Sequence, residues 1–110
     1  MTKMQTAVCD CEFGFTDHDL SNVFGDGGVT PEDFATVFSE DMHMAFMRQI
    51  PLWKIHPGYE GSSILCYLDD ILEPKAGSYI ACFTVEITCP DAVDLPGTFM
   101  TVLKDMGVIK

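Results

Sequence analysis

Apolar residues alternate with polar or small residues over much of the first fifteen positions. They occupy every second position from Ala7 to Phe15, which is a period of two. This period is typical of a strand with one buried face and one solvated face. We therefore expect a first strand from Gln5 to Phe15. Cys9 and Cys11 would share one face of that strand, where they are best interpreted as small core residues.

Two helices are predicted next, and each follows a threonine that can cap it. Thr16 can cap a short helix over residues 17–24. Thr30 gives the stronger signal, because a proline and two acids follow it, and these residues favour the first turn of a helix. This second helix should run to about Gln49, since Pro51 prevents its continuation. Its apolar stripe consists of Phe34, Phe38, Met42, Ala45 and Phe46, with Val37 beside it.

Three further strands are predicted in the second half of the chain. Leu52 to His56 is interpreted as a short strand. Ile64 to Asp70 and Tyr79 to Cys89 form the two arms of a hairpin, and the turn-rich segment from Glu73 to Gly77 lies between them. The second arm alternates cleanly between apolar and other residues, so it should have one buried face.

A last helix should begin at Asp94 or Leu95 and end at Gly107. Every element then has a single apolar side, which two packed layers can bury. We predict one α+β domain over residues 1–110, built as a two-layer sandwich. A small, largely antiparallel sheet of three or four strands would carry the two main helices on one face, with a ferredoxin-like arrangement as one variant.

The other face of that sheet would leave several apolar side chains in water. A monomer normally exposes less contiguous apolar area than this, so we expect a homodimer or a partner docked on that face. The residues concerned are Val8, Leu65, Tyr67, Ile80 and Cys82.

Net charge points to the kind of partner. Seventeen acidic residues against six basic ones give a formal charge of −11. Residues 1–47 hold nine acids and a single lysine, a net of −8. Such a surface repels nucleic acid and anionic membranes, so we expect a basic protein partner and no direct binding to either. Simple solubility is the alternative explanation of the same charge.

The cysteines and the N-terminal residues indicate a reducing compartment. There are five cysteines, an odd number, and they lie in strand-like segments rather than in loops. This pattern fits reduced, buried thiols better than a disulfide framework. No apolar run reaches the length of a signal peptide or a membrane span. We therefore expect a cytoplasmic protein.

Neither calcium nor zinc is favoured by the spacing of possible ligands. The segment from Asp26 to Phe34 shares its glycine and acid positions with the second half of an EF-hand loop. Counting back places Asn22 and Phe24 at the first two ligand positions, and phenylalanine cannot bind calcium. The cysteines and histidines also lack the paired spacing of a zinc site. We expect no metal and no cofactor.

No catalytic residue is predicted. His18, His43 and His56 stand in no recognisable frame, and the usual phosphate-binding, hydrolase and metalloprotease motifs are missing from the sequence. Two alternatives to a binding protein stay open. One is a small dimeric enzyme or ligand-binding domain with a pocket between sheet and helices, bordered by His43, His56 or a cysteine. The other is a structural oligomeric subunit.

The composition favours a small acidic binding or inhibitor protein that docks on a basic surface of another protein. We expect that partner to belong to a nucleic-acid-handling complex, with carboxylates acting as a nucleic-acid mimic. Small phage-encoded inhibitors of host defence share this size and acidity, although no motif identifies a family. The candidate partner-binding residues are Asp10, Glu12, Asp17, Asp19, Glu32, Asp33, Glu40, Asp41, His56 and Tyr59.

Overall fold

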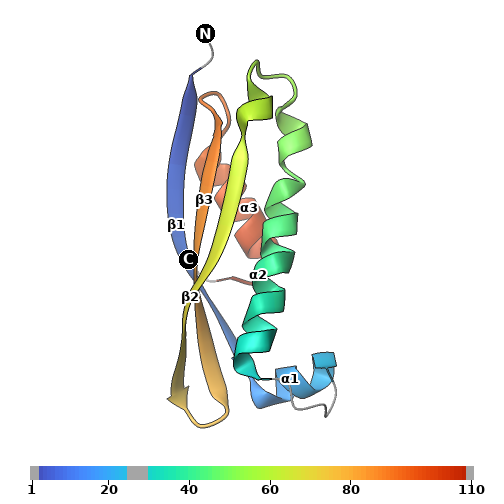
Figure 1. Cartoon of the computed structure of the whole chain (residues 1–110), viewed down its shortest axis with the longest axis vertical. Coiled ribbons are helices and arrows are strands. Elements are labelled where there is room, and N and C mark those ends of the chain that lie inside the picture. The colour runs from blue at the N-terminus through green and yellow to red at the C-terminus, as the bar shows by residue number, and fades with distance from the viewer. Residues whose placement is uncertain (1–2, 25–29, 109–110) are drawn as a thin grey trace.

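A three-stranded sheet forms one layer of the protein, and the main helices form the other (Figure 1). The computed structural model describes residues 3–24 and 30–108. Within these ranges no helix has the length and apolar character needed to cross a membrane. The predicted two-layer α+β architecture is confirmed, with three strands. The elements are β1 (Met4–Thr16), α1 (Asp17–Phe24), α2 (Pro31–Met47), β2 (Ser63–Lys75), β3 (Ser78–Pro90) and α3 (Leu95–Asp105).

The strands pair in the order β1-β3-β2, and both pairings are antiparallel. β1 pairs with β3 without interruption, from Met4 opposite Pro90 to Thr16 opposite Ser78. β2 and β3 form a long hairpin whose register shifts twice, first after Leu68. Along the chain, β1 is followed by two helices, then by the hairpin and by a last helix.

One face of the sheet is buried under the helices. The inward side chains of β3 from Ala81 to Cys89 are almost completely buried, and the most exposed of them, Phe83, is 1 % exposed. Met42 and Phe46 of α2 are equally buried and belong to the same core. Phe46 also meets Phe99 of α3 edge to face, with ring centroids 5.9 Å apart. This contact joins the two helices above the sheet.

Stacked phenylalanine rings attach the first half of α2 to β1. Phe13 and Phe38 have ring centroids 4.1 Å apart, and Phe15 and Phe34 have centroids 4.6 Å apart. The predicted stripe on α2 and the predicted inward residues of β1 therefore meet. Such pairs add roughly 0.5 to 1.5 kcal/mol each beyond the area that they bury.

The capping residues act as the sequence indicates. Thr30 Oγ1 accepts a hydrogen bond from Asp33 N at 3.1 Å, and Asp33 Oδ2 accepts one from Thr30 N at 3.3 Å. The two residues thus form a capping box at the start of α2. At the start of α3, the Asp94 side chain accepts from Gly97 N at 3.1 Å.

Gln5 fastens the connection between β3 and α3. Its side-chain amide donates toward the carbonyl oxygens of Pro90, Asp91 and Val93, at 3.1, 3.3 and 2.8 Å. Pro90 is the last residue of β3, and its carbonyl also accepts from Val93 N at 3.0 Å, whereas Asp91 and Val93 follow the end of the strand. A side chain from the first strand thereby positions the last helix.

The strand expected from Leu52 to His56 is wrong. Residues Ile50–Trp53 form a 3-10 helix, in which Leu52 N donates to Gln49 O at 3.0 Å. Proline suits the first position of a helical turn, because its fixed φ and its missing N–H fit that position. Trp53 is only 5 % exposed, which confirms its expected place in the core. The turn expected at residues 25–28, and with it part of the EF-hand-like segment, lies outside the described residues.

Replacing Thr30 tests the capping box. Thr30→Ala should lower the free energy of unfolding by about 0.5 to 2 kcal/mol, because Asp33 N loses its acceptor. Thr36→Ala is the matched control, since Thr36 is exposed inside the same helix and alanine is a better helix former. Urea denaturation of both variants measures the difference. Equal stability of the two variants would contradict the capping role.

Candidate protein-binding face

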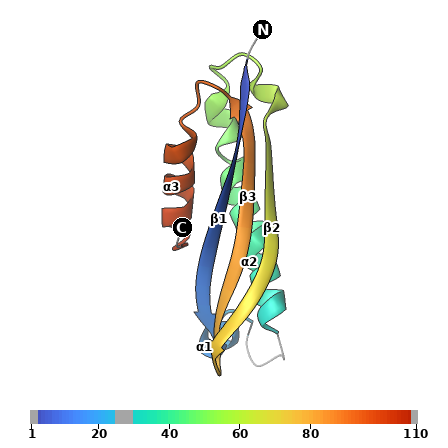
Figure 2. The ribbon, with the colours of Figure 1, turned by 90° about the vertical axis from the view of Figure 1, so that its left-hand side faces the viewer.

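Figure 2 shows the three strands in front, on the side of the sheet away from the helices. A row is a set of residues that lie opposite one another on the three strands. We define the outer face as the outward side chains of the sheet from one such row to another, with both rows included. The first row is Thr6, Thr88 and Ser63, and the last is Gly14, Ile80 and Leu72.

Several apolar side chains lie on the outer face, as predicted. Val8 is 60 % exposed, and Leu65 and Tyr67 are 44 % and 46 % exposed. Ile80 and Cys82 are half-buried between their neighbours. Apolar side chains of this exposure are available for contact with another molecule.

Five carboxylates share this outer face with the apolar residues. No lysine or arginine occurs in its rows, so the face carries a formal charge of −5. It therefore holds almost half of the total charge of −11 on a small part of the surface. The five are Asp10 and Glu12 of β1, Asp69 and Asp70 of β2, and Glu86 of β3.

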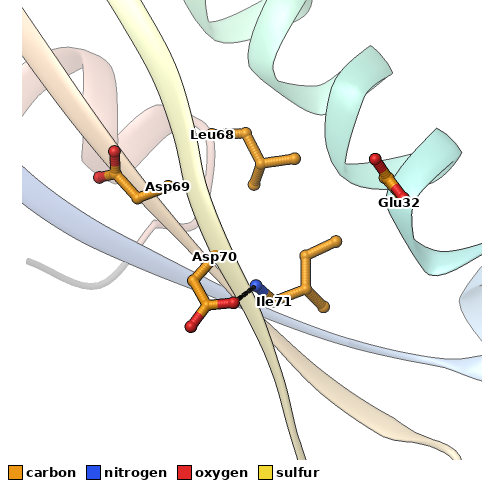
Figure 3. Close-up of a pocket in the computed structure, with 5 residues that line it drawn as sticks. All are labelled: Glu32, Leu68, Asp69, Asp70 and Ile71. Atoms are coloured by element: carbon orange, nitrogen blue, oxygen red, sulfur yellow. Dashed lines mark hydrogen bonds between the residues drawn. The ribbon is translucent and has the colours of Figure 1, made fainter.

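A β-bulge brings two consecutive carboxylates to the same side of β2. The pairing skips Asp69, so that Leu68 lies opposite Phe83 and Asp70 lies opposite Cys82. In Figure 3, Leu68 and Ile71 point toward α2, whereas Asp69 and Asp70 point away from it. Neighbouring residues of a regular strand would face opposite ways, and one extra residue removes that alternation locally.

Thr84 on the central strand lies between carboxylates from both outer strands. Its hydroxyl oxygen is 3.1 Å from Asp10 Oδ1 and also within hydrogen-bonding distance of Asp69 Oδ2. A hydroxyl has one hydrogen, so it donates to one carboxylate at a time. The three groups hold negative charge from β1 and β2 close together above β3.

A hollow of about 380 Å³ opens beside these carboxylates. Cys82 contributes a thiol there whose pKa is raised, first by burial and then by the negative charges of Glu12, Asp70 and Asp69. The thiol therefore stays protonated at neutral pH and is a poor nucleophile. A cationic group that entered the hollow would meet carboxylate oxygens and a rim of neutral side chains. It is lined by Asp10, Cys11, Glu12, Asp69, Cys82 and Phe83.

The other predicted partner-binding acids lie away from the outer face. Asp17 accepts a hydrogen bond from the Tyr79 hydroxyl at 2.8 Å, and Asp19 accepts one from Thr16 N at 2.8 Å. Both bonds stabilise the junction of β1 and α1. Asp33 belongs to the capping box of α2. Glu40 and Asp41 are exposed along α2, which covers the opposite side of the sheet. Glu32 is exposed on the same helix and borders a hollow together with residues 68–71 of β2.

His56 and Tyr59 come from the segment before β2. Both are half-buried, and Tyr59 packs against the core. His56 borders a shallow hollow near the start of α3, together with Trp53 and Asp94. The structure therefore assembles only Asp10 and Glu12 of the predicted set on the outer face.

Another hollow, of about 450 Å³, lies between α2 and β2 and includes both a histidine and a cysteine. His43 Nε2 lies 3.0 Å from Ile64 O, which fixes α2 to the edge of the sheet. Burial raises the pKa of Cys66 to about 11, so its thiol is protonated at neutral pH. A nucleophilic cysteine acts as a thiolate, and the raised pKa of Cys66 disfavours that form.

The cysteines on the inner face belong to the core. Cys9, Cys11 and Cys89 are at most 5 % exposed, which confirms that Cys9 and Cys11 act as small core residues. None of the five cysteines, all of which lie in the described ranges, forms a disulfide. Across residues 3–24 and 30–108, no group of three or more His, Cys, Asp or Glu side chains could hold a metal ion.

Alkaline pH should destabilise the fold through Cys11. Burial, and then the charges of Cys9, Cys66 and Asp10, raise its pKa from 9.0 to about 12. Above pH 9 the unfolded thiol loses its proton while the folded thiol keeps it, so the free energy of unfolding falls as pH rises toward 12.

Urea denaturation at about pH 8 and about pH 10.5 measures this loss. Cys11→Ala removes the titrating thiol, so the variant should lose less stability between the two pH values than the wild type. Cys66, with its pKa of about 11, should account for part of the remaining loss. An equal loss in both proteins would show that Cys11 does not cause it.

Comparisons with protein-family models, with curated proteins and with solved structures found no match for this chain. Its functional interpretation therefore depends on the geometry and charge of the outer face.

Proposed function

We propose that this chain is a small acidic binding protein that docks its outer face on a basic surface of a partner protein. The supporting observation is the set of five carboxylates on one face of a rigid sheet, with no basic side chain among them. Charges of one sign gathered on one surface steer an oppositely charged partner and raise its association rate.

Apolar residues on the same face would provide the short-range part of the binding energy. Val8 and Leu65 lie in one row, and Tyr67 follows in the next, beside Asp10 and Thr84. Tyrosine is frequent at binding hot spots, because it combines a large apolar ring with a hydroxyl. Charge would then set the rate and the orientation of the encounter, while apolar contacts would slow dissociation.

A protein that handles nucleic acid fits this face as a partner. Its phosphate-binding groove is lined with Lys and Arg, and carboxylates on a rigid scaffold can occupy the same groove. The carboxylates of Asp10 and Glu12 project from one side of one strand, where the repeat is about 6.6 Å. Docking would then block the groove, so the chain would act as an inhibitor of the nucleic-acid mimic type.

A second copy of the chain is a poor occupant for the outer face. Stacking two such faces would bring five carboxylates against five others, which costs free energy unless cations intervene. The homodimer expected from the sequence stays a prediction, and it would need another surface.

Affinity capture with matched variants tests the proposal. The outer-face variant combines Asp10→Asn, Glu12→Gln and Asp70→Asn, and the control combines Glu32→Gln, Glu40→Gln and Asp41→Asn on α2. Each variant loses three negative charges, but only one loses them from the outer face. The tagged wild type should capture a basic protein from host or target-cell lysate, less of it at about 0.5 M salt. The outer-face variant should lose that protein and the α2 control should keep it.

Mass spectrometry identifies the captured protein, and circular dichroism confirms that both variants fold. Capture that survives the outer-face substitutions but fails with the α2 control would overturn the proposed surface. Capture that does not respond to salt would overturn the electrostatic mechanism.

A further inference from the structure

The two edges of the sheet differ in how well they are protected. Along the β2 edge, His43 contacts the carbonyl of Ile64, a bulge follows Leu68, and Pro74 and Lys75 end the strand. Bulges, proline and lysine are common devices that prevent another chain from pairing with an edge strand. β1 has none of them: its pairing with β3 is continuous from Met4 to Thr16 and includes no proline or lysine.

Two hydrogen bonds at the ends of the β1–β3 ladder show which backbone groups face the free edge. Asp17 N donates to Gly77 O, and Asp91 N donates to Lys3 O, both at 3.0 Å. Each bond continues the register of the ladder and involves an odd-numbered residue on the β1 side. In an antiparallel ladder, alternate residues bond to the neighbouring strand. The even-numbered residues of β1 therefore direct their N–H and C=O groups away from β3.

The neighbouring contacts agree with this assignment. Thr16 N, an even-numbered group, donates to the side chain of Asp19 instead of to β3. Among the remaining edge groups, the described contacts include only a weak one, from the Cys9 thiol to the Asp10 carbonyl at 3.7 Å. The edge groups without another strand belong to Thr6, Val8, Asp10, Glu12 and Gly14.

The helix layer extends past this edge. In the view onto the outer face, α3 stands beyond β1, whereas α2 lies behind the other two strands (Figure 2). Figure 1 places α3 on the same side of the sheet as α2. A strand added next to β1 would therefore have α3 on its inner side.

We propose that the partner binds by adding an extended segment to β1 as a fourth, antiparallel strand. This proposal rests on the proposed function, because the carboxylates of the outer face select the segment. Residues paired with Asp10 and Glu12 would place Lys or Arg on the outer face, where opposite charges on neighbouring strands attract. Residues between them would face inward beside Cys9 and Cys11, so they would be apolar. The occupant is thus a segment in which basic and apolar residues alternate.

Charge opposes a second copy at this edge. Two β1 strands side by side would bring together two sets of Asp10 and Glu12, on chains that each carry −11. A basic segment in the same position would be attracted by the carboxylates of Asp10 and Glu12. It would also satisfy the N–H and C=O groups that now face solvent.

Amide hydrogen exchange tests the geometry directly on the full chain. In the free protein, the amides of Ala7, Cys9 and Cys11 should exchange slowly, and those of Val8, Asp10 and Glu12 should exchange fast. The probe is a short synthetic peptide in which lysine and valine alternate. When it binds, exchange of the even-numbered amides should slow by about tenfold or more, because each gains a hydrogen bond.

Two methylated versions of the peptide separate strand addition from simple charge attraction. In the proposed pairing, the lysine residues lie opposite the even-numbered residues of β1 and exchange backbone hydrogen bonds with them. N-methylation of the lysine amides should therefore weaken binding by about tenfold or more, whereas N-methylation of the valine amides should change it little. Both peptides have the same charge and composition.

Each other outcome has a definite meaning. Equal affinity for both methylated peptides, together with unchanged amide exchange on β1, overturns strand addition. If that binding still weakens with salt, the proposed function stands. If binding depends on the methylation pattern but is unchanged by Asp10→Asn combined with Glu12→Gln, strand addition is supported. The idea that the carboxylates select a basic segment is then overturned. Slow exchange of the even-numbered amides in a free protein with the mass of a dimer shows that a second copy fills the edge and overturns the proposal.

Discussion

The pairing of β3 with both other strands is the interaction on which the rest of the molecule depends. β3 is the central strand of the sheet, and its inward residues from Ala81 to Cys89 are almost completely buried. It joins β1, which begins the described chain, to β2, which follows α2. The two neighbours of β3 are edge strands that, within the described ranges, pair with no other strand. Their register with β3 therefore positions every side chain of the outer face. Thr84 illustrates this, since a hydroxyl on β3 brings together carboxylates from both sides.

Both main helices pack on one face of the sheet, and this leaves the outer face without a covering layer among the described residues. The core needs a single apolar layer, and α2 and α3 supply it on the inner side. The outer face keeps apolar side chains in water and holds five carboxylates within one small area. Mutual repulsion makes such an arrangement unfavourable in the isolated chain, and this cost would be recovered when a cationic surface neutralises it. In the proposed function, structural stability and binding would use opposite faces of the same three strands.

Much of the fold could be predicted from local signals. The alternation in β1 and β3, the cap at Thr30 and the start of α3 depend on neighbouring residues, and the structure confirms all four. The segment from Leu52 to His56 does not form the predicted strand, because a short apolar run has no clear period and Pro51 favours the 3-10 helix Ile50–Trp53. The outer face could be predicted only in part. Asp10 and Glu12 lie on a regular strand, whereas Asp69 faces outward only because of a bulge that depends on pairing with β3.

The bulge at Asp69 also bears on how this surface could change over evolutionary time. Leu68 and Ile71 face inward, and removal of Asp69 would leave Leu68, Asp70 and Ile71 in ordinary alternation. One residue can thus be gained or lost at this point without changing which side chains reach the core. Deletion of the Asp69 codon would remove one carboxylate from the surface and leave the inward positions of Leu68 and Ile71 unchanged. At this position the charge of the outer face can therefore change without any repacking of the interior.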